Sequence, residues 1–408
     1  TFAGSLSGDD SQNIAVGPGG NIYVVGTSEA SWGSAINPHS GGEDVFVAKL
    51  NSAGELQWNT FLGSSFDDKG QSIAVDSNGD VLIVGFGEAT WGVPGIPFPW
   101  GDNAFAAKLH SNGQLQWHSF MTPNGGTRAL DVAADAVGNV YLAGWGNSLW
   151  FTPEVEYYRP GNGAFVAKLN SSGTELWHAY MGSETDDAMD FGAAVAVGAS
   201  GNVFVAGRSG LTWGSPIDWF AGGNTDGFVA KLDSNGYRQW NTFLGGVDGD
   251  ELRGVAVDTS DNVYVAGYSL AGWGTPIIPY AGEWDAFAAK LDSAGSGQWL
   301  TFLGSVDHGE LGWDIAVDGG RNVYVTGVSM GIWGIPFGPV LTHPGGFVAE
   351  LNPDGVLQWN YFLEAILDGM ALDGSRTIYA SGGGDVDWGT PVNPKEGPMG
   401  SWDAFVAR

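Results

Sequence analysis

The stretch IAVGPGGNIYVVG (residues 14–26) decides the fold, because variants of it recur seven times along the 408 residues. Each copy consists of an apolar run, a turn and a second apolar run that ends in glycine. The closing glycines follow one another at intervals of 59, 59, 63, 60, 60 and 55 residues. A repeat of about 58 residues that fills residues 1–408 indicates one domain of seven units, each longer than the ~40–45 residues of a WD40 blade.

Two further apolar segments complete each copy. In the first copy they are DVFVAKL (residues 44–50) and LQWNTFL (residues 56–62), which are joined by a glycine-bearing turn. The four segments lack the apolar 3.6-residue period of a helix. The first three are apolar or small on both faces, as in sheets that are covered on both sides. The sequence therefore predicts an all-β protein, a seven-bladed β-propeller of four-stranded antiparallel blades.

The two ends of the chain predict how the ring closes. The opening TFAG (residues 1–4) matches TFLG at the end of a fourth segment (residues 60–63), whereas the chain stops within a third segment at FVAR (residues 405–408). We therefore expect the N-terminal strand to pair with the C-terminal blade and to close the ring. The chain also begins without Met or a leader sequence, which indicates a processed or trimmed piece.

The blocks DAFAAKLDSAGSGQWLTFLG (residues 285–304) and VAVDTSDNVYVAG (residues 255–267) resemble the bacterial SBBP repeats of the seven-bladed β-propeller family. The resemblance covers the whole chain, although the regular Trp-Gly of the loops departs from the family pattern. It implies a repeat module of large bacterial proteins, often secreted or at the cell surface. The family brings no catalytic motif to this chain.

The composition excludes several classes of protein. The 45 acidic and 15 basic residues give a formal net charge of −30, which opposes binding to nucleic acid and to anionic membranes. The 68 glycines and 19 tryptophans are typical of a turn-rich β protein with many aromatic residues. The chain has no Cys for disulfides or thiol chemistry, and it has no apolar run of the ~18 residues that a membrane span needs.

Two sets of loops in a propeller emerge on the same face, which we call the loop face. The loops from second to third strands carry a repeated Trp-Gly, whose tryptophans include Trp32, Trp91, Trp213, Trp273 and Trp333. Six tryptophans that interrupt the repeat belong to single blades: Trp100, Trp145, Trp219, Trp284, Trp313 and Trp402. The loops from fourth to first strands are acidic, and their side chains include Asp67, Asp68, Asp186, Asp187, Asp248, Asp250, Asp307 and His308.

Aromatic rings and carboxylates on one face suggest a glycan site. A ring covers the C–H face of a sugar while carboxylates accept hydrogen bonds from its hydroxyls. The six blade-specific tryptophans are the better ligand candidates, because packing common to all blades does not explain them. For the repeated Trp-Gly, anchoring of the long loop onto its blade is the alternative interpretation.

The acidic loops also suggest calcium as an alternative. Ca²⁺ takes six to eight oxygen ligands, and two adjacent carboxylates supply too few of them. We therefore expect no cofactor, and the sequence leaves any metal site unassigned. His308 is the one histidine in an acidic loop. Its position is compatible with acid–base chemistry and also with a solvated loop that has no chemical role.

The seventh copy is shorter than the others on the loop face. The fourth-strand Phe and the first-strand apolar residue are 12 residues apart from Phe61 to Ile73, but 8 apart from Phe362 to Met370. We therefore expect the loop face to be asymmetric at the seventh blade.

The leading hypothesis is a non-catalytic, secreted or cell-surface bacterial module that binds a glycan on its loop face. The first alternative is a structural surface or assembly protein whose rigid disc holds protein partners. The second is a hydrolase or lyase that uses acidic residues at the mouth of the central channel.

Overall fold

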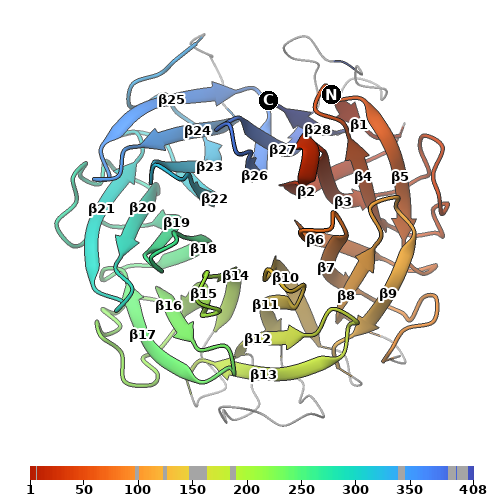
Figure 1. Ribbon diagram of the computed structural model, residues 1–408. Coiled ribbons are helices and arrows are strands. Elements are labelled where there is room, and N and C mark those ends of the chain that lie inside the picture. The colour runs from red at the N-terminus through yellow and green to blue at the C-terminus, as the bar shows by residue number, and fades with distance from the viewer. Residues whose placement is uncertain are drawn as a thin grey trace.

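The computed structural model describes residues 1–5, 7–96, 101–122, 126–146, 163–183, 190–338, 345–384, 392 and 403–408. These residues form seven four-stranded antiparallel sheets around a central axis (Figure 1). This arrangement confirms the predicted seven-bladed β-propeller. In the part of the chain that the structure describes, the one helix is a 3-10 turn at Pro18–Gly20, and no helix is long and apolar enough to cross a membrane.

Six of the sheets are built from consecutive strands, from the innermost at the axis to the outermost at the rim (Figure 1). Blade 1 contains β2 (Asp9–Val16), β3 (Ile22–Ser28), β4 (Asp44–Leu50) and β5 (Leu56–Leu62); blade 2 contains β6 (Asp68–Val75), β7 (Val81–Gly87), β8 (Asn103–Leu109) and β9 (Leu115–Phe120); blade 3 contains β10 (Thr127–Ala134), β11 (Val140–Gly146), β12 (Gly163–Leu169) and β13 (Glu175–Met181). Blade 4 contains β14 (Phe191–Val197), β15 (Val203–Ser209), β16 (Asp226–Leu232) and β17 (Arg238–Leu244); blade 5 contains β18 (Asp250–Val257), β19 (Val263–Ser269), β20 (Asp285–Leu291) and β21 (Gly297–Leu303); blade 6 contains β22 (Glu310–Val317), β23 (Val323–Ser329), β24 (Gly346–Leu351) and β25 (Leu357–Leu363).

Blade 7 draws on both ends of the chain. It contains β26 (Ile366–Leu372), β27 (Ile378–Gly384), β28 (Asp403–Ala407) and, at the rim, β1 (Phe2–Ala3). Phe2 lies opposite Phe405 in this antiparallel pair. The N-terminal amine of Thr1 donates to Val406 O at 2.9 Å, and Val406 N donates to Thr1 O at 2.8 Å. The first and last strands of the chain are therefore partners in one sheet.

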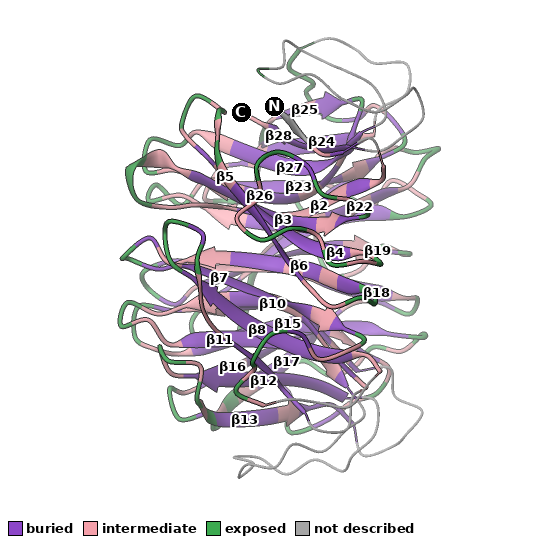
Figure 2. Ribbon diagram, turned by 90° about the vertical axis from the view of Figure 1, so that its right-hand side faces the viewer, coloured by how far each residue is buried: buried purple, intermediate pink, exposed green. Residues whose placement is uncertain are grey.

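Apolar side chains on both faces of the sheets hold neighbouring blades together. Between blades 1 and 2, for example, Val45 and Val47 share a buried cluster with Ile83. Buried residues continue through the successive strands while the exposed residues lie in the turns and loops (Figure 2). Because each sheet is covered on both faces, its strands read as apolar runs rather than as alternating patterns.

The tryptophans of the outermost strands fasten each of blades 1 to 5 to the following blade. The indole Nε1 of Trp58 donates to Ser111 O in blade 2 at 3.1 Å, and that of Trp240 donates to Ser293 O in blade 5 at 3.2 Å. The same ring of Trp58 covers the turn at Gly113, where a Cβ would lie 3.0 Å from the ring and φ is +85°. Glycine at this turn therefore provides both the backbone conformation and the room for the neighbouring indole.

Buried acids meet across four blade junctions: Asp403 lies near Asp9 between blades 7 and 1, and three further junctions have the following arrangement. One acid begins the third strand of a blade and the other begins the innermost strand of the next blade: the pairs are Asp44 with Asp68, Asp226 with Asp250, and Asp285 with Glu310. All six side chains are at most 1% exposed. A Cβ on Gly63 would lie 3.1 Å from Asp68 Oδ2 and closer still to Asp44 Oδ1. Glycine therefore makes room for both carboxyl groups of that pair.

These pairs are short of hydrogen-bond donors. Ser64 N donates to Asp68 Oδ2 at 2.6 Å, but Asp44 Oδ1 and Asp68 Oδ1 have no partner. Burial, and the charge of the opposite acid, raise the pKa of Asp68 to about 7. The same causes raise the pKa values of Asp226 and Glu310 to about 7. Each pair therefore retains a proton close to neutral pH.

The junction between blades 2 and 3 contains a neutral version of the same arrangement. Asn103 and Thr127 occupy the two positions, and Thr127 Oγ1 donates to Asn103 Oδ1 at 3.0 Å. The junction between blades 2 and 3 therefore accommodates a neutral hydrogen-bonded pair, whereas the three junctions with these acid pairs accommodate two carboxyl groups that share a proton.

We expect the free energy of unfolding to fall as the pH rises from 5 to 8. The pKa of each of these carboxyl groups is about 4 in the unfolded chain and higher in the folded protein, so the stabilisation is complete below the unfolded value and is lost as the pH rises through the folded value. Urea unfolding at constant ionic strength should reveal a loss of roughly 2 kcal/mol or more over this range.

The substitution Asp44→Asn should reduce this dependence and stabilise the protein at pH 8, since Asn103 occupies the matching position of blade 2. Asp67→Asn is the control, because Asp67 is an exposed neighbour and its substitution removes the same charge. Wild-type stability that increases from pH 5 to 8 would contradict proton sharing.

Candidate functional site

Each innermost strand contains a β-bulge that leaves one residue out of the ladder. In β2 the register shifts between Ser11 and Asn13, so Gln12 is unpaired. The equivalent residues of the seven blades are Gln12, Gln71, Leu130, Ala193, Arg253, Trp313 and Asp368. All seven line one hollow of about 410 Å³ on the axis. Because a bulge redirects a side chain, this ring of bulge residues is the candidate site.

A cation and an aromatic ring form one wall of this axial hollow. The guanidinium of Arg253 lies 4.8 Å from the ring centroid of Trp313, and its Nε lies 2.7 Å from Glu251 Oε1. Glu251 is 2% exposed and also accepts from Arg208 Nη1 at 2.7 Å. Two arginines therefore surround one buried carboxylate, and Arg253 is the one cation among the described residues that line the axial hollow.

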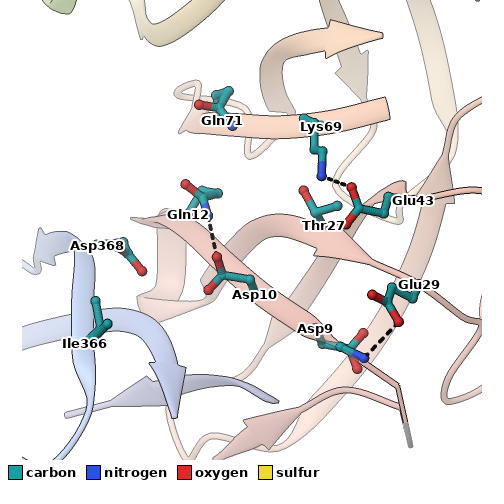
Figure 3. A pocket seen from close by; sticks show the side chains of 11 residues that line it. Asp9, Asp10, Gln12, Thr27, Glu29, Glu43, Lys69, Gln71, Ile366 and Asp368 are labelled. Atoms are coloured by element: carbon teal, nitrogen blue, oxygen red, sulfur yellow. Dashed lines mark hydrogen bonds and ion pairs between the residues drawn. The ribbon is translucent and has the colours of Figure 1, made fainter. Parts of the chain in front are cut away.

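The opposite wall continues into a second hollow of about 380 Å³, which shares Gln12, Gln71 and Asp368 with the first. Figure 3 shows its lining, in which the side chains of Asp10 and Asp368 approach the cavity from blades 1 and 7. Gln12 Nε2 donates to Asp10 Oδ2 at 2.7 Å. Lys69 forms an ion pair with Glu43. This second hollow is therefore predominantly anionic, and we call it the anionic hollow.

The carboxyl groups of the anionic hollow resist ionisation. Burial and the nearby charge of Asp10 raise the pKa of Asp368 to about 8. Burial also raises the pKa of Asp10, against the effects of Gln12 and Lys69. These shifts indicate that the charges of the two acids are poorly compensated within the described part of the chain.

The expected asymmetry at blade 7 contributes to this hollow. Only residues 364 and 365 separate β25 from β26, whereas residues 63–67 separate β5 from β6. Ile366 and Asp368 at the start of β26 consequently border the anionic hollow directly. The short loop confirms that the loop face differs at this blade.

Buried hydrogen bonds around the axial hollow tie adjacent blades together. Asp131, which follows the bulge of β10, accepts from Ser72 Oγ of blade 2 at 2.7 Å and from Val195 N of blade 4 at 2.7 Å. Asp314 in blade 6 accepts from Met370 N of blade 7 at 2.9 Å. Burial is the main cause that raises the pKa of Asp131 to about 6 and that of Asp314 to about 7. The bulge therefore orients two successive residues, one toward the axis and the next toward a neighbouring blade.

The repeated Trp-Gly residues lie away from this site. Trp32, Trp91, Trp213 and Trp333 are 7–8% exposed, and Trp273 is partly buried. The ring of Trp32 packs edge-on between Phe46 and Phe61, with centroid distances of 5.4 and 5.9 Å. Asn59 Nδ2 donates to Trp32 O at 2.7 Å. These contacts correspond to the loop-anchoring interpretation, so we do not include the repeated tryptophans in the candidate site.

The blade-specific tryptophans occupy different environments. Trp313 lines the axial hollow, and Trp145 stacks near Phe191 of its wall at 6.1 Å. Trp219 and Trp284 are 67% and 47% exposed. Trp100 and Trp402 lie outside the described residues. Of the four tryptophans of this set that the structure describes, Trp313 is the one that lines the axial hollow.

The acidic loop residues divide into buried and exposed groups. Asp68 and Asp250 belong to the interblade acid pairs, whereas Asp67, Asp248, Asp307 and His308 are exposed. Asp186 and Asp187 lie outside the described residues. Across the described residues, no group of three or more His, Asp or Glu side chains forms a metal-binding cluster. The acidic residues expected on the loop face therefore include both buried and exposed side chains.

The sequence interpretation missed most of the ring of bulge residues. Every one of them lies two positions before an apolar residue of the first strand, as Gln12 lies before Ile14. The flanking residues repeat, but this position holds Gln, Gln, Leu, Ala, Arg, Trp and Asp in successive blades. Variation at a fixed position of the repeat was the signal that could have identified it.

Comparisons with known proteins agree with the architecture. The family model described as the SBBP beta-propeller repeat matches residues 239–272. Together with the seven equivalent blades, this match confirms the resemblance to SBBP repeats.

Two curated relatives match part of the chain. Regulatory protein FlaEY of Caulobacter vibrioides is 31% identical over 139 residues, which cover 33% of this chain and 14% of that protein. An uncharacterized WD repeat-containing protein of Acanthamoeba polyphaga mimivirus is 27% identical over 167 residues, which cover 35% of this chain and 12% of that protein. The matches therefore span only a small part of each relative.

Solved structures share the fold at low sequence identity. Kuenenia stuttgartiensis hydrazine synthase aligns with a TM-score of 0.58 and 11% identity over 93% of this chain and 94% of its own. The WD40 domain of Neurospora crassa Pan2 aligns with a TM-score of 0.52 and 9% identity over 91% of this chain and 85% of its own. Identities this low establish the common fold alone.

We expect Asp131→Ala to destabilise the protein by about 1–2 kcal/mol, because it leaves Ser72 Oγ and Val195 N without their acceptor. Leu130→Ala is the matched control, since Leu130 is the adjacent bulge residue and makes no such bridge between blades. Urea unfolding at pH 8 measures both changes. Equal effects of the two substitutions would show that Asp131 does not link the blades energetically.

Proposed function

We propose that the protein is a non-catalytic binding module that takes a carbohydrate in the axial hollow. The observation that carries this proposal is the convergence of seven different side chains from one repeated position on a single cavity. A ring that served packing alone would use similar residues in successive blades, as the outermost tryptophans do in blades 1 to 6. The variation of the bulge residues instead suits an asymmetric ligand.

The chemistry of the lining supports a sugar. The amides of Gln12 and Gln71 can both donate and accept hydrogen bonds, and Asp368 accepts them from hydroxyl groups. Trp313 supplies an aromatic surface beside these groups. A cavity with a few convergent polar groups and an aromatic wall is the usual form of a small-molecule site. The secreted or cell-surface location expected from the SBBP resemblance is part of this proposal.

The substitution Trp313→Ala should weaken carbohydrate binding at least 10-fold, a loss of about 1.4 kcal/mol, because it removes the aromatic wall. The experiment is isothermal titration of neutral mono- and oligosaccharides that a glycan array identifies as ligands. Trp219→Ala is the control, since this indole is exposed outside both hollows. Thermal unfolding confirms that each variant is folded.

Unchanged binding by a folded Trp313→Ala protein, with loss of binding in Trp219→Ala, would move the site to the exterior. Mass spectrometry of the same mixtures tests the catalytic alternative. We expect the oligosaccharides to be recovered intact, and shortened or unsaturated products would replace the binding proposal with a hydrolase or lyase.

A second candidate is a protein scaffold, which an exposed apolar group on blades 5 and 6 favours. Val247, Leu270, Val306 and Met330 are 73%, 40%, 70% and 62% exposed. Backbone bonds from Leu270 N to Gly249 O and from Met330 N to Gly309 O join the two sets of loops that carry them. Sedimentation of the wild type and of Val306→Ser with Met330→Ser measures whether this surface mediates self-association.

A further inference from the structure

We propose that the ligand of the axial hollow carries a protonated amine, which binds between Asp10 and Asp368 in the adjoining anionic hollow. This inference rests on the proposed carbohydrate function and narrows it to amino sugars. It concerns the end of the site formed by blades 7 and 1, where the lining groups are acidic.

The first argument is the charge of the lining. Within the described residues, Lys69 is the one cation that borders the anionic hollow, and it is paired with Glu43. Asp10, Glu29 and Asp368 border the same space. Two of these carboxyl groups, those of Asp10 and Asp368, approach the cavity from the neighbouring blades 1 and 7 (Figure 3). The hollow therefore gathers acidic groups whose burial favours their protonated forms, and a bound cation would offset the cost of ionising them.

The second argument is the geometry of hydrogen bonding. A protonated amine has three donors, and carboxylates accept without competing for them. Gln12 already uses Nε2 to donate to Asp10, so its carbonyl oxygen is the part of the amide that suits an additional donor. Asp10, Asp368 and Gln12 together offer an acceptor for each N–H of the amine.

A divalent metal fits this space less well than an amine. Ca²⁺ takes six to eight oxygen ligands. The described residues contain no cluster of three or more acidic or histidine side chains that would hold a metal ion. Three acceptors are sufficient for an ammonium group but cover at most half of a calcium coordination shell.

The other residues of the axial hollow determine how the ligand is oriented in the site. Trp313 and Asp368 occupy the same bulge position on the neighbouring strands β22 and β26. An amine at Asp368 therefore places the attached sugar ring beside Trp313. Beyond that ring stands Arg253, whose guanidinium repels an ammonium group. The amine is thus directed to the blade 7 and blade 1 end.

N-acetylation provides the chemical test, since it removes the charge and two of the three donors. The experiment is calorimetric titration of the protein at pH 6.5 with glucosamine, N-acetylglucosamine and glucose, each as the monosaccharide and as the β-1,4-linked tetrasaccharide. We expect the amine form to bind at least 10-fold more tightly than the other two. Cyclohexylamine tests whether an amine binds without a sugar.

The substitution Asp368→Asn should reduce this preference to less than 2-fold while binding of the neutral sugars persists. Asp307→Asn is the control, because it removes the same charge from an exposed loop residue outside both hollows. Equal affinities for glucosamine and glucose would overturn the amine inference and leave the carbohydrate proposal intact. Binding of cyclohexylamine but of no sugar would overturn the carbohydrate proposal, and calcium binding that Asp368→Asn abolishes would assign the hollow to a metal.

Discussion

The β-bulge of each innermost strand is the constraint on which the candidate site depends. Seven strands converge on one axis, and each places a single residue outside its ladder at the same register. Gln12 shows the consequence, because its side chain enters the axial hollow while its neighbours remain paired with β3. In blades 3 and 6 the next residue, Asp131 or Asp314, reaches the backbone of an adjacent blade. The bulge thus couples the lining of the channel to the cohesion of the ring.

The acidic side chains of the protein lie in three different environments. At the blade junctions, acids such as Asp44 and Asp68 are buried beside each other, and a retained proton limits their repulsion. In the loops, Asp67 and Asp307 are solvated. In the anionic hollow, Asp10 and Asp368 are neither solvated as freely nor paired with a cation. Acidic groups without a cationic partner therefore border a cavity that a ligand can reach.

The fold could be predicted from the sequence because the same pattern of strands and turns recurs in every blade. The apolar runs of residues 14–26 recur in every blade, and their small or apolar character on both faces specifies stacked sheets. Residues 1–4 match the end of the fourth strand of the repeat. This match predicted that they pair with β28, the third strand of the last blade. Such features need no knowledge of individual side-chain contacts.

The site was less predictable, because the exposure and direction of its side chains depend on strand register and packing, which the sequence pattern does not encode. Asp67 and Asp68 are adjacent and chemically identical, yet one is exposed and the other is enclosed by Ser64, Gly63 and Asp44. The repeated Trp-Gly fitted both a ligand surface and an anchor, and the packing of Trp32 between two phenylalanines corresponds to the anchor. Gln71 and Arg253 carry no motif, since a bulge is invisible until the register of its partner strand is known.

The central claim is that ligands enter the axial hollow, and the indole N–H resonance of Trp313 tests it most directly. Two-dimensional ¹⁵N–¹H NMR separates the indole signals, and the Trp313→Phe protein assigns the one in question by its loss. The account predicts that titration with a bound sugar shifts this signal and leaves those of Trp219 and Trp284 in place. Shifts confined to Trp219 or Trp284, with Trp313 unperturbed, would contradict it.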